Sequence, residues 1–333
     1  MQQRKEQAGK TGKKVVLAEP RGFCAGVRRA IAVVEQALEV YGPPVYVRKE
    51  IVHNHYVVRT LEGKGARFVD SEEDVPPGSV CVFSAHGVAP AVHETAAGRG
   101  LDVIDATCPL VSKVHQEAKR FSRDGRTILL IGHADHEEVE GTFGEAPDRT
   151  IIVESVADAE RLDLPRDAPL SYLTQTTLSV DDTAGIVTAL KDRFDDLLGP
   201  ASDDICYASS NRQHAVKAIA KRCQLVLVVG SRNSSNAIRM VEVARDVGVS
   251  AHLVPEVAEL DESWLDGVET VGVSAGASTP EILISRLLDR LAELGYGDLE
   301  IESTVTENVI FSVPPGLAKR EPRANQALPT TAD

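Results

Sequence analysis

The sequence has 333 residues, of which 43% are hydrophobic and 26% are charged, a balance typical of soluble globular proteins with two or three domains. The formal net charge of −14 argues against general nucleic-acid binding, which favours a basic surface. No apolar stretch approaches the ~20 residues that a membrane-spanning helix needs. The polar N-terminus has no apolar core typical of a secretory signal. These features predict a cytoplasmic protein without nucleic-acid or membrane partners.

One pattern of elements occurs three times along the chain. Each copy has a short apolar strand, a cysteine, an amphipathic helix, and two further apolar strands that each end in a polar loop. In the first copy the three strands are expected at 14–20, 43–49 and 79–88, around Cys24. The helix after Cys24 carries apolar residues at helical spacing, namely Val27, Ile31, Val34 and Leu38.

The second and third copies follow the same order. The second has strands at 101–107, 126–132 and 170–179 around Cys108, and the third has strands at 202–208, 224–230 and 270–279 around Cys206. The middle of the polar loop that follows the second strand lies 29 residues after Cys24, 28 after Cys108 and 29 after Cys206. This spacing indicates an internal threefold repeat.

The repeat predicts an α/β fold of three similar small units with mostly parallel sheets, in a trefoil-like pseudo-threefold arrangement around a common centre. We expect the units at 14–100 (with Cys24), 101–198 (with Cys108) and 199–315 (with Cys206 and a closing C-terminal strand). Residues 1–13 and 316–333 are polar and aperiodic and are expected to be disordered tails. Because ligands bind at the carboxyl ends of parallel strands, all the polar loops are expected around one central cavity.

Three of the five cysteines precede a predicted helix, where free N–H groups and the helix dipole stabilise a thiolate. There is no C-x-x-C motif, which excludes compact zinc-finger, thioredoxin and ferredoxin signatures. Three converging thiolates, from Cys24, Cys108 and Cys206, can instead bind three irons of a 4Fe–4S cluster and leave the fourth iron open to substrate. Cys81 and Cys223 lie in apolar segments and are interpreted as structural.

The polar loops are rich in imidazole, hydroxyl and amide groups, which suit a phosphate or diphosphate. The candidates are His53, His55, His86, His133, His136, Thr176, Ser234, Ser235, Asn236 and Ser278. A zinc site is the alternative for the histidines, but the sequence alone picks out no set of three or four ligands. The loop "HADHEEVEG" also offers a carboxyl group as proton donor. We expect Glu137 to face solvent, and the sequence barely separates Glu138 from Glu140.

Several of these stretches, such as "PRGFCAGVRRAI", "DATCPLVSKVH", "LTQTTLSVDDT" and "GSRNSSNA", resemble the 4-hydroxy-3-methylbut-2-enyl diphosphate reductases of the LytB/IspH family. The similarity covers roughly residues 14–315. It implies a trefoil-like fold around a 4Fe–4S cluster with one open iron. It further implies reductive dehydroxylation of an allylic alcohol diphosphate to isopentenyl and dimethylallyl diphosphates, the last step of the non-mevalonate isoprenoid pathway. The electron donor implied is a ferredoxin or a flavodoxin.

The resemblance also assigns roles to residues. Cys24, Cys108 and Cys206 correspond to the cluster ligands, Glu138 to the proton donor, and Thr176 to a residue that orients the substrate hydroxyl. The diphosphate-binding positions correspond to His53, His86, His136, Ser234, Ser235, Asn236 and Ser278. The family commonly has His-Pro-Glu where this chain has His136-Glu137-Glu138, which bears on the choice between the two acids. In the implied mechanism the open iron binds the substrate hydroxyl as a Lewis acid, and Glu138 protonates it as it leaves.

Two alternatives remain from the sequence. A 4Fe–4S cluster with three cysteine ligands also serves hydratases that move water without redox change, and such an enzyme would consume no electron donor. A cluster-based sensor without enzymatic activity is the other alternative, and it predicts an additional DNA-binding or partner domain, which the sequence does not display.

Overall fold

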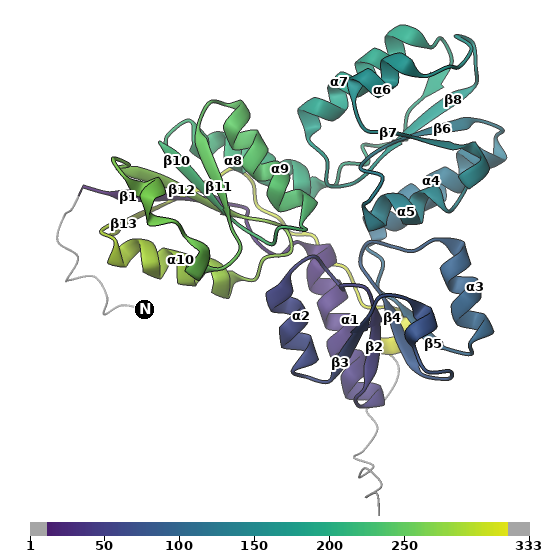
Figure 1. The fold of residues 1–333 in the computed structure, drawn as a ribbon, viewed down its shortest axis with the longest axis horizontal. Helices are drawn as coiled ribbons and strands as arrows, with labels where there is room; N and C mark the ends of the chain where they lie inside the picture. Colours follow the sequence, from purple (N-terminus) through teal and green to yellow (C-terminus); the bar gives the residue numbers. More distant parts are fainter. Residues whose placement is uncertain (1–11, 319–333) are drawn as a thin grey trace, which may run out of the picture.

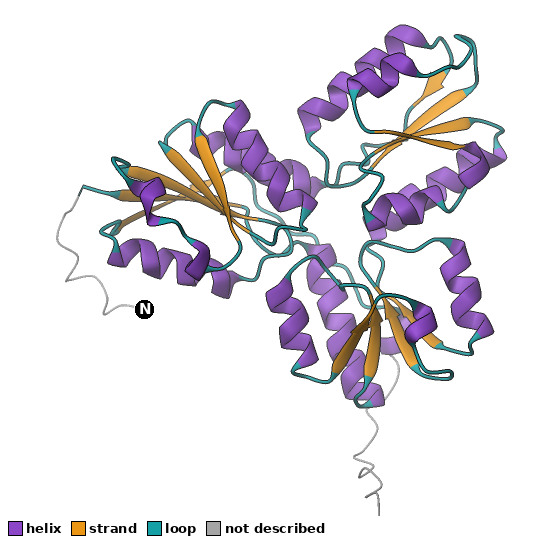
Figure 2. Ribbon diagram, viewed as in Figure 1, coloured by secondary structure: helices purple, strands orange, loops and turns teal. Residues whose placement is uncertain are grey.

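The computed structural model describes residues 12–318. Three parallel sheets, each covered by helices, radiate from a common centre (Figures 1 and 2). Most of the two tails predicted to be disordered lies outside the described residues. Residues 316–318, however, belong to helix α11 (Pro315–Ala318), and Leu317 of this helix is buried against the first unit.

The first unit has a four-stranded sheet in the order β3-β2-β4-β5. Its strands are β2 (Val45–Arg48), β3 (Ala66–Val69), β4 (Val80–Phe83) and β5 (Asp102–Asp105), and its helices are α1 (Ala25–Tyr41), α2 (His55–Glu62) and α3 (Pro90–Gly98). The face of α1 expected from the sequence packs on this sheet, with Val27, Val34 and Leu38 buried and Ile31 partly buried.

The second unit repeats this topology in the order β7-β6-β8-β9. Its strands are β6 (Thr127–Ile131), β7 (Thr150–Val153), β8 (Leu170–Thr174) and β9 (Leu197–Leu198), and its helices are α4 (Pro109–Arg123), α5 (Glu137–Phe143), α6 (Val156–Arg161) and α7 (Val180–Arg193). Every strand pairing is parallel.

The third unit has five strands in the order β11-β10-β12-β1-β13. Its strands are β1 (Lys14–Glu19), β10 (Leu225–Val229), β11 (Ser250–Val254), β12 (Thr270–Ala275) and β13 (Asp298–Ser303), and its helices are α8 (Tyr207–Ala220), α9 (Ser235–Asp246) and α10 (Glu281–Glu293). Four positions of this sheet correspond to those of the other two sheets, and β13 is an addition at the edge. The predicted trefoil-like α/β fold of three similar parallel units is therefore confirmed.

The expected unit boundaries differ from the structure by one strand. The sequence placed each strand that precedes a cysteine in the unit that follows it, but β1 pairs with β12 and β13, and β5 pairs with β4 of the first unit. No strand forms at 202–206 ahead of Cys206; the two-residue β9 pairs with β8 of the second unit instead. The chain therefore leaves each sheet through such a strand and crosses the centre before it begins the next unit.

This arrangement places the site where the units meet. The carboxyl ends of the parallel strands face the centre, and the loops that follow them line it (Figure 1).

The remaining cysteines lie away from these loops: Cys81 is buried in β4, and Cys223, three residues beyond the end of α8, packs in the core beneath that helix. Within residues 12–318, no helix has the length and apolar character needed to cross a membrane.

Candidate active site

The three chain crossings meet at the centre through equivalent hydrogen bonds. The main-chain N–H of Cys24 donates to the carbonyl of Ala277 (3.1 Å), that of Cys108 to Ala85 (3.0 Å), and that of Cys206 to Thr176 (3.1 Å). Each acceptor lies just after the strand that occupies the same position in its own sheet, namely β12, β4 or β8. The pseudo-threefold symmetry thus extends to the backbone around each cysteine.

Each of these cysteines is the residue immediately before a helix. The thiol of Cys24 accepts a hydrogen bond from the N–H of Val27 (3.4 Å), and that of Cys206 accepts one from Ser209 (3.3 Å). At Cys108 the helix begins with a proline, which is favoured at the first helical position. Helix N-termini interact favourably with negative charge, so all three thiols lie where the helix dipole favours a metal-bound thiolate.

Gly26 leaves the space that two of the thiols occupy. A Cβ atom at this position would lie 2.7 Å from Sγ of Cys108 and 3.8 Å from Sγ of Cys24. Any side chain here would displace the sulfur of Cys108. The first turn of α1 therefore fits the close approach of sulfur ligands from two units, and the three free thiols provide the soft donor set that iron prefers.

Burial makes two of the thiols, those of Cys108 and Cys206, difficult to ionise. Burial raises the pKa of Cys108 to about 12, and the neighbouring Cys24 and Cys206 add to this shift. Burial likewise raises the pKa of Cys206 to about 11. Three buried thiolates at one centre repel one another unless a cation neutralises them, and a bound metal ion deprotonates its thiol ligands outright. The electrostatics of the centre therefore fit a positively charged metal group.

All the residues to which the resemblance assigned a role line one central cavity. They are Cys24, Cys108, Cys206, His53, His86, His136, Glu138, Thr176, Ser234, Ser235, Asn236 and Ser278. The other two candidate histidines lie outside it, because the side chain of His55 is 64% exposed and His133 lines an adjacent pocket. The structure thus brings together thiols, imidazoles, hydroxyls, an amide and one carboxyl group.

Glu138 is the buried acid of this cavity, only 3% exposed. The main-chain N–H of Thr176 donates to its Oε1 (2.6 Å), and the hydroxyl of Thr176 donates to its Oε2 (2.9 Å). Burial raises the pKa of Glu138 to about 7, although these hydrogen bonds oppose the shift. A carboxyl group with this pKa holds a proton near neutral pH and can release it. Glu140, by contrast, has a side chain that is 56% exposed and pairs with Lys49.

The three cavity histidines lie close together. The rings of His53 and His86 stack with centroids 4.0 Å apart, and His136 meets His53 edge-on at 5.4 Å. Burial lowers the pKa of His136 to about 3, with contributions from His86 and His53, and burial also lowers the pKa of His53. The N–H of Glu138 donates to Nδ1 of His136 (3.2 Å), which leaves Nε2 of this ring as the hydrogen-bond donor.

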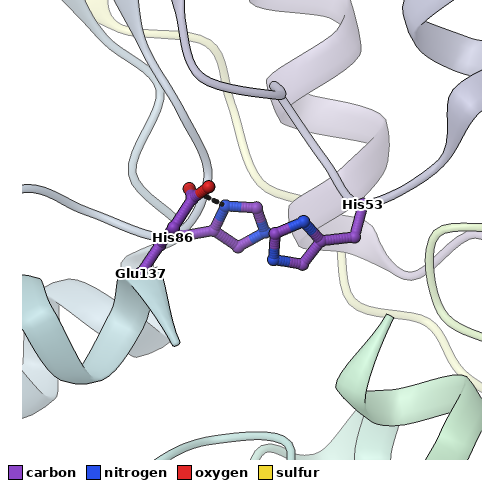
Figure 3. A group of neighbouring side chains, drawn as sticks. All are labelled: His53, His86 and Glu137. Atoms are coloured by element: carbon purple, nitrogen blue, oxygen red, sulfur yellow. Dashed lines mark hydrogen bonds and ion pairs between the residues drawn. The ribbon is translucent and has the colours of Figure 1, made fainter. Parts of the chain in front are cut away.

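Glu137 does not face solvent, and the sequence expectation was wrong on this point. Its side chain is 18% exposed, and its Oε2 lies 3.0 Å from Nδ1 of His86 in the first unit (Figure 3). Burial opposes ionisation, but the hydrogen bond and the charge of His86 outweigh it and lower the pKa of Glu137 to about 2. The contact crosses a unit boundary, which helical alternation within one segment cannot reveal.

His53, His86 and Glu137 have ligand atoms close enough together to suggest a metal site (Figure 3). The ring geometry argues against it. The two rings are 14° from parallel, and the lone pair of an imidazole nitrogen lies in the ring plane, so stacked rings cannot both direct a nitrogen at one ion. In addition, Nδ1 of His86 already binds Glu137. This group is better suited to hydrogen-bonding an anion than to holding zinc.

The hydroxyl and amide groups lie on the side of the third unit. Ser234 caps α9, and Ser278 donates a hydrogen bond to the carbonyl of His53 (2.9 Å), which joins the third unit to the first. The side chain of Asn236 accepts a bond from the N–H of Ala277 (2.8 Å) and donates to the hydroxyl of Ser209 (3.3 Å). Asn236 therefore also holds the loop whose carbonyl binds the N–H of Cys24.

Sequence reasoning missed several residues of the centre. Thr177 and Ser209 line the cavity, and Thr177 donates to the hydroxyl of Ser235 (3.1 Å). Arg212 is fully buried and donates to the carbonyl of Gly22 (2.7 Å) and to Glu307 (3.1 Å), so it ties α8 to the segment that leads to Cys24. Ser209 and Arg212 follow Cys206 by three and six residues, and this spacing was the available signal.

Comparisons with known proteins show the family of this chain. The model of the family described as "LytB protein" matches residues 15–292. The chain belongs to the LytB family. A relative from Nocardia farcinica, named 4-hydroxy-3-methylbut-2-enyl diphosphate reductase, is 58% identical over 91% of each chain. One from Cutibacterium acnes with the same name is 56% identical over 94% of this chain and 98% of its own.

Two solved structures are also similar to this LytB family member. The E-1-hydroxy-2-methyl-but-2-enyl-4-diphosphate reductase from Plasmodium falciparum superimposes with a TM-score of 0.90 at 42% identity, over 92% of this chain and 97% of that one. A second structure, of (E)-4-hydroxy-3-methyl-but-2-enyl diphosphate reductase, gives a TM-score of 0.61 at 31% identity, over 84% of this chain and 99% of that one.

Proposed function

We propose that this protein reduces 4-hydroxy-3-methylbut-2-enyl diphosphate to isopentenyl and dimethylallyl diphosphates, the last step of the non-mevalonate isoprenoid pathway. The observation that carries the proposal is the composition of the central cavity. One thiol from each unit, a buried acid and a group of neutral hydrogen-bond donors line the same space. The relatives named as this reductase match over more than nine-tenths of the chain.

The family uses an iron–sulfur cluster, and we propose that Cys24, Cys108 and Cys206 hold a 4Fe–4S cluster with one iron free of protein ligands. When bound, such a cluster supplies single electrons and a Lewis-acidic iron for the substrate oxygen. The space left by Gly26 and the three free thiols support this assignment. The electrons come from a partner such as a ferredoxin or a flavodoxin.

Glu138 and Thr176 act on the hydroxyl group that leaves. Hydroxide is a poor leaving group, so a proton has to reach the oxygen as the C–O bond breaks. With Glu138 protonated on Oε2, the hydroxyl of Thr176 accepts that hydrogen bond and can turn its own O–H towards the substrate. Proton transfer then releases water and leaves Glu138 as a carboxylate held by the N–H of Thr176.

The imidazole, hydroxyl and amide groups bind the diphosphate. His53 and His136 have lowered pKa values because they are buried, and they are therefore neutral and able to donate without a fixed charge. The negative charge of a diphosphate favours their protonation, so substrate binding and proton uptake are coupled. Ser234, Ser235, Asn236 and Ser278 supply further donors from the third unit.

A non-redox hydratase with the same type of cluster, and a cluster-based sensor, were the alternatives from the sequence. The names of the relatives support the reductase over both. The test is an anaerobic assay with the hydroxylated diphosphate and reduced ferredoxin, flavodoxin or a one-electron dye. We expect two electrons consumed for each molecule of product and formation of both isomers. Conversion without oxidation of the donor would exclude a reductase.

A further inference from the structure

The acid at the centre needs a supply of protons. In the proposed reaction each turnover consumes two electrons and two protons and releases one water. Glu138 gives up a proton in each cycle and has to regain it, yet it is 3% exposed and both of its oxygens bind Thr176. The protein therefore needs a route that carries protons from solvent to this carboxylate.

His115 of α4 is buried and pairs with Glu145. Nδ1 of His115 is 2.7 Å from Oε1 of Glu145, and the other oxygen of Glu145 is 3.1 Å from Nζ of Lys119. Lys119 and Glu145 both line a groove on the outer face of α4, and the side chain of Lys119 is 55% exposed. One end of the His115–Glu145 pair thus reaches the protein surface.

The other end of the pair, Nε2 of His115, packs against the glycine that follows His86 and against α5, the helix that carries Glu138. Among the described residues, Nε2 of His115 is buried and has no hydrogen-bond partner. A Cβ atom at Gly87 would lie 2.9 Å from this nitrogen, and one at Gly141 would lie 3.3 Å from it. Gly87 follows His86, and Gly141 lies one helical turn after Glu138 on α5. The two glycines therefore leave room for a ring whose free nitrogen faces the turn that carries the acid.

Charges link the two groups as well. Burial raises the pKa of Glu138, and the charge of His115 is among the effects that lower it, so His115 lies within electrostatic reach of the acid. Asp204, which pairs with Lys113, raises the pKa of Glu138. The charged residues that line the groove are Lys113, Glu117, Lys119, Arg120, Arg123 and Glu145.

We propose that Glu145 and His115 form a proton relay that returns protons from the α4 groove to Glu138. The proton on Nε2 of His115 passes to the Glu138 carboxylate through a bridging water, because Nε2 makes no direct hydrogen bond within the described residues. Nδ1 takes up a proton that enters from the groove through the Glu145 carboxylate. A turn of the ring brings its protonated nitrogen back towards Glu138, and Glu145 is again a carboxylate at the end of the cycle. No electrons move in this step. The proposal rests on the role of Glu138 in the proposed function.

The decisive variant is His115→Ala, which removes the ring and leaves its space open. We expect kcat to fall by about tenfold or more because proton delivery becomes limiting. Cluster absorption and iron content should stay unchanged, and added imidazole should restore turnover in a concentration-dependent manner. The control is His252→Ala, at a residue that stacks on Trp264 from edge strand β11 and should neither lose activity nor respond to imidazole.

Glu145→Gln tests the outer half of the relay and serves alone if His115→Ala does not fold. We expect a similar loss of kcat and a larger solvent deuterium isotope effect than in the wild type. Infrared titration of the Glu138 carboxyl band gives a readout apart from turnover, and its midpoint should rise in His115→Ala. If the pair is only structural, both variants will unfold at a lower temperature, imidazole will not restore turnover and the isotope effect will not change. That result would overturn the relay. So does wild-type kcat in both variants. If the wild type itself forms no product, the proposed function fails instead.

Discussion

The centre of the molecule and the cores of its three units are both buried, but they consist of different side chains. The cores contain mostly valine, leucine, isoleucine and alanine from the strands and the helix faces that cover them. The centre contains thiols, imidazoles, hydroxyls and a carboxyl group. Burial raises the pKa of Cys81 in a core and of Cys108 at the centre to about 12 alike, so burial alone does not distinguish the two regions.

The difference lies in the free energy of burial. Apolar side chains in the cores stabilise each unit by roughly 25 cal/mol for each Å² removed from water. Polar groups at the centre cost free energy unless they find partners. We infer that the cores supply stability, whereas the centre is maintained for its ligands. Changes in the two regions should therefore separate stability from activity.

The largest effect is expected for the ligand cysteines. Cys108→Ser should abolish the visible absorption of anaerobically purified protein together with its activity, and Cys24→Ser and Cys206→Ser should do the same. The matched core variant is Cys81→Ala, which should retain iron and turnover and lose only ~1–2 kcal/mol of stability. Iron analysis and thermal unfolding measure both. Loss of iron from Cys81→Ala, with iron retained in Cys108→Ser, would show that the ligands are misassigned.

The next effect concerns the space between the units. In Gly26→Ala the new Cβ would lie 2.7 Å from Sγ of Cys108, so the sulfur has to move. We expect a folded protein with little cluster and little activity. Gly98→Ala in α3 is the control, because nothing lies within 4 Å of a Cβ there. It should be neutral or stabilise by ~0.4–1 kcal/mol. Equal cluster content in the two variants would contradict the proposed approach of Cys108.

Glu138→Gln comes third. Glutamine retains the shape and most hydrogen bonds but is a very poor acid, so the rate should fall by ~10²–10⁴ while the cluster and substrate binding remain. Because the pKa of Glu138 is raised to about 7, the wild-type rate should fall as the pH rises through about 7 and the acid loses its proton. Stopped-flow assays across this range measure both effects. The exposed Glu140→Gln is the control, and near-normal turnover by Glu138→Gln would mean that another acid serves.

Much of the fold followed from local patterns. The helix faces and the continuous apolar strands revealed the three units, and the placement of Cys24, Cys108 and Cys206 before helices revealed the centre. Local patterns did not predict which sheet β1 or β5 joins. An apolar strand can pair with either neighbouring sheet, and its partners, such as β12 for β1, lie far away in the sequence.

The site was predictable to a similar extent and for the same reason. Loops at the carboxyl ends of parallel strands converge, so the candidate residues could be selected from the strand pattern. Contacts between units could not be read in this way. Glu137 binds His86 of another unit, and His115 reaches Gly87 across the same boundary. Such pairs depend on how the units meet, which no single segment encodes.

The smallest effect is expected for Glu137→Gln, which tests whether adjacent acids at the centre have different roles. The carboxylate of Glu137 forms a hydrogen bond with Nδ1 of His86 and fixes the orientation of this ring in the cavity. Because the pKa of Glu137 is lowered to about 2, its charge is present throughout the neutral range. Glutamine keeps a hydrogen bond but loses this charge. Substrate affinity should therefore weaken by about 1 kcal/mol, or roughly fivefold in Kd, with kcat nearly unchanged.

Calorimetry with the diphosphate and steady-state assays separate the two quantities. A loss of kcat as large as that of Glu138→Gln, with unchanged affinity, would instead make Glu137 part of the proton pathway.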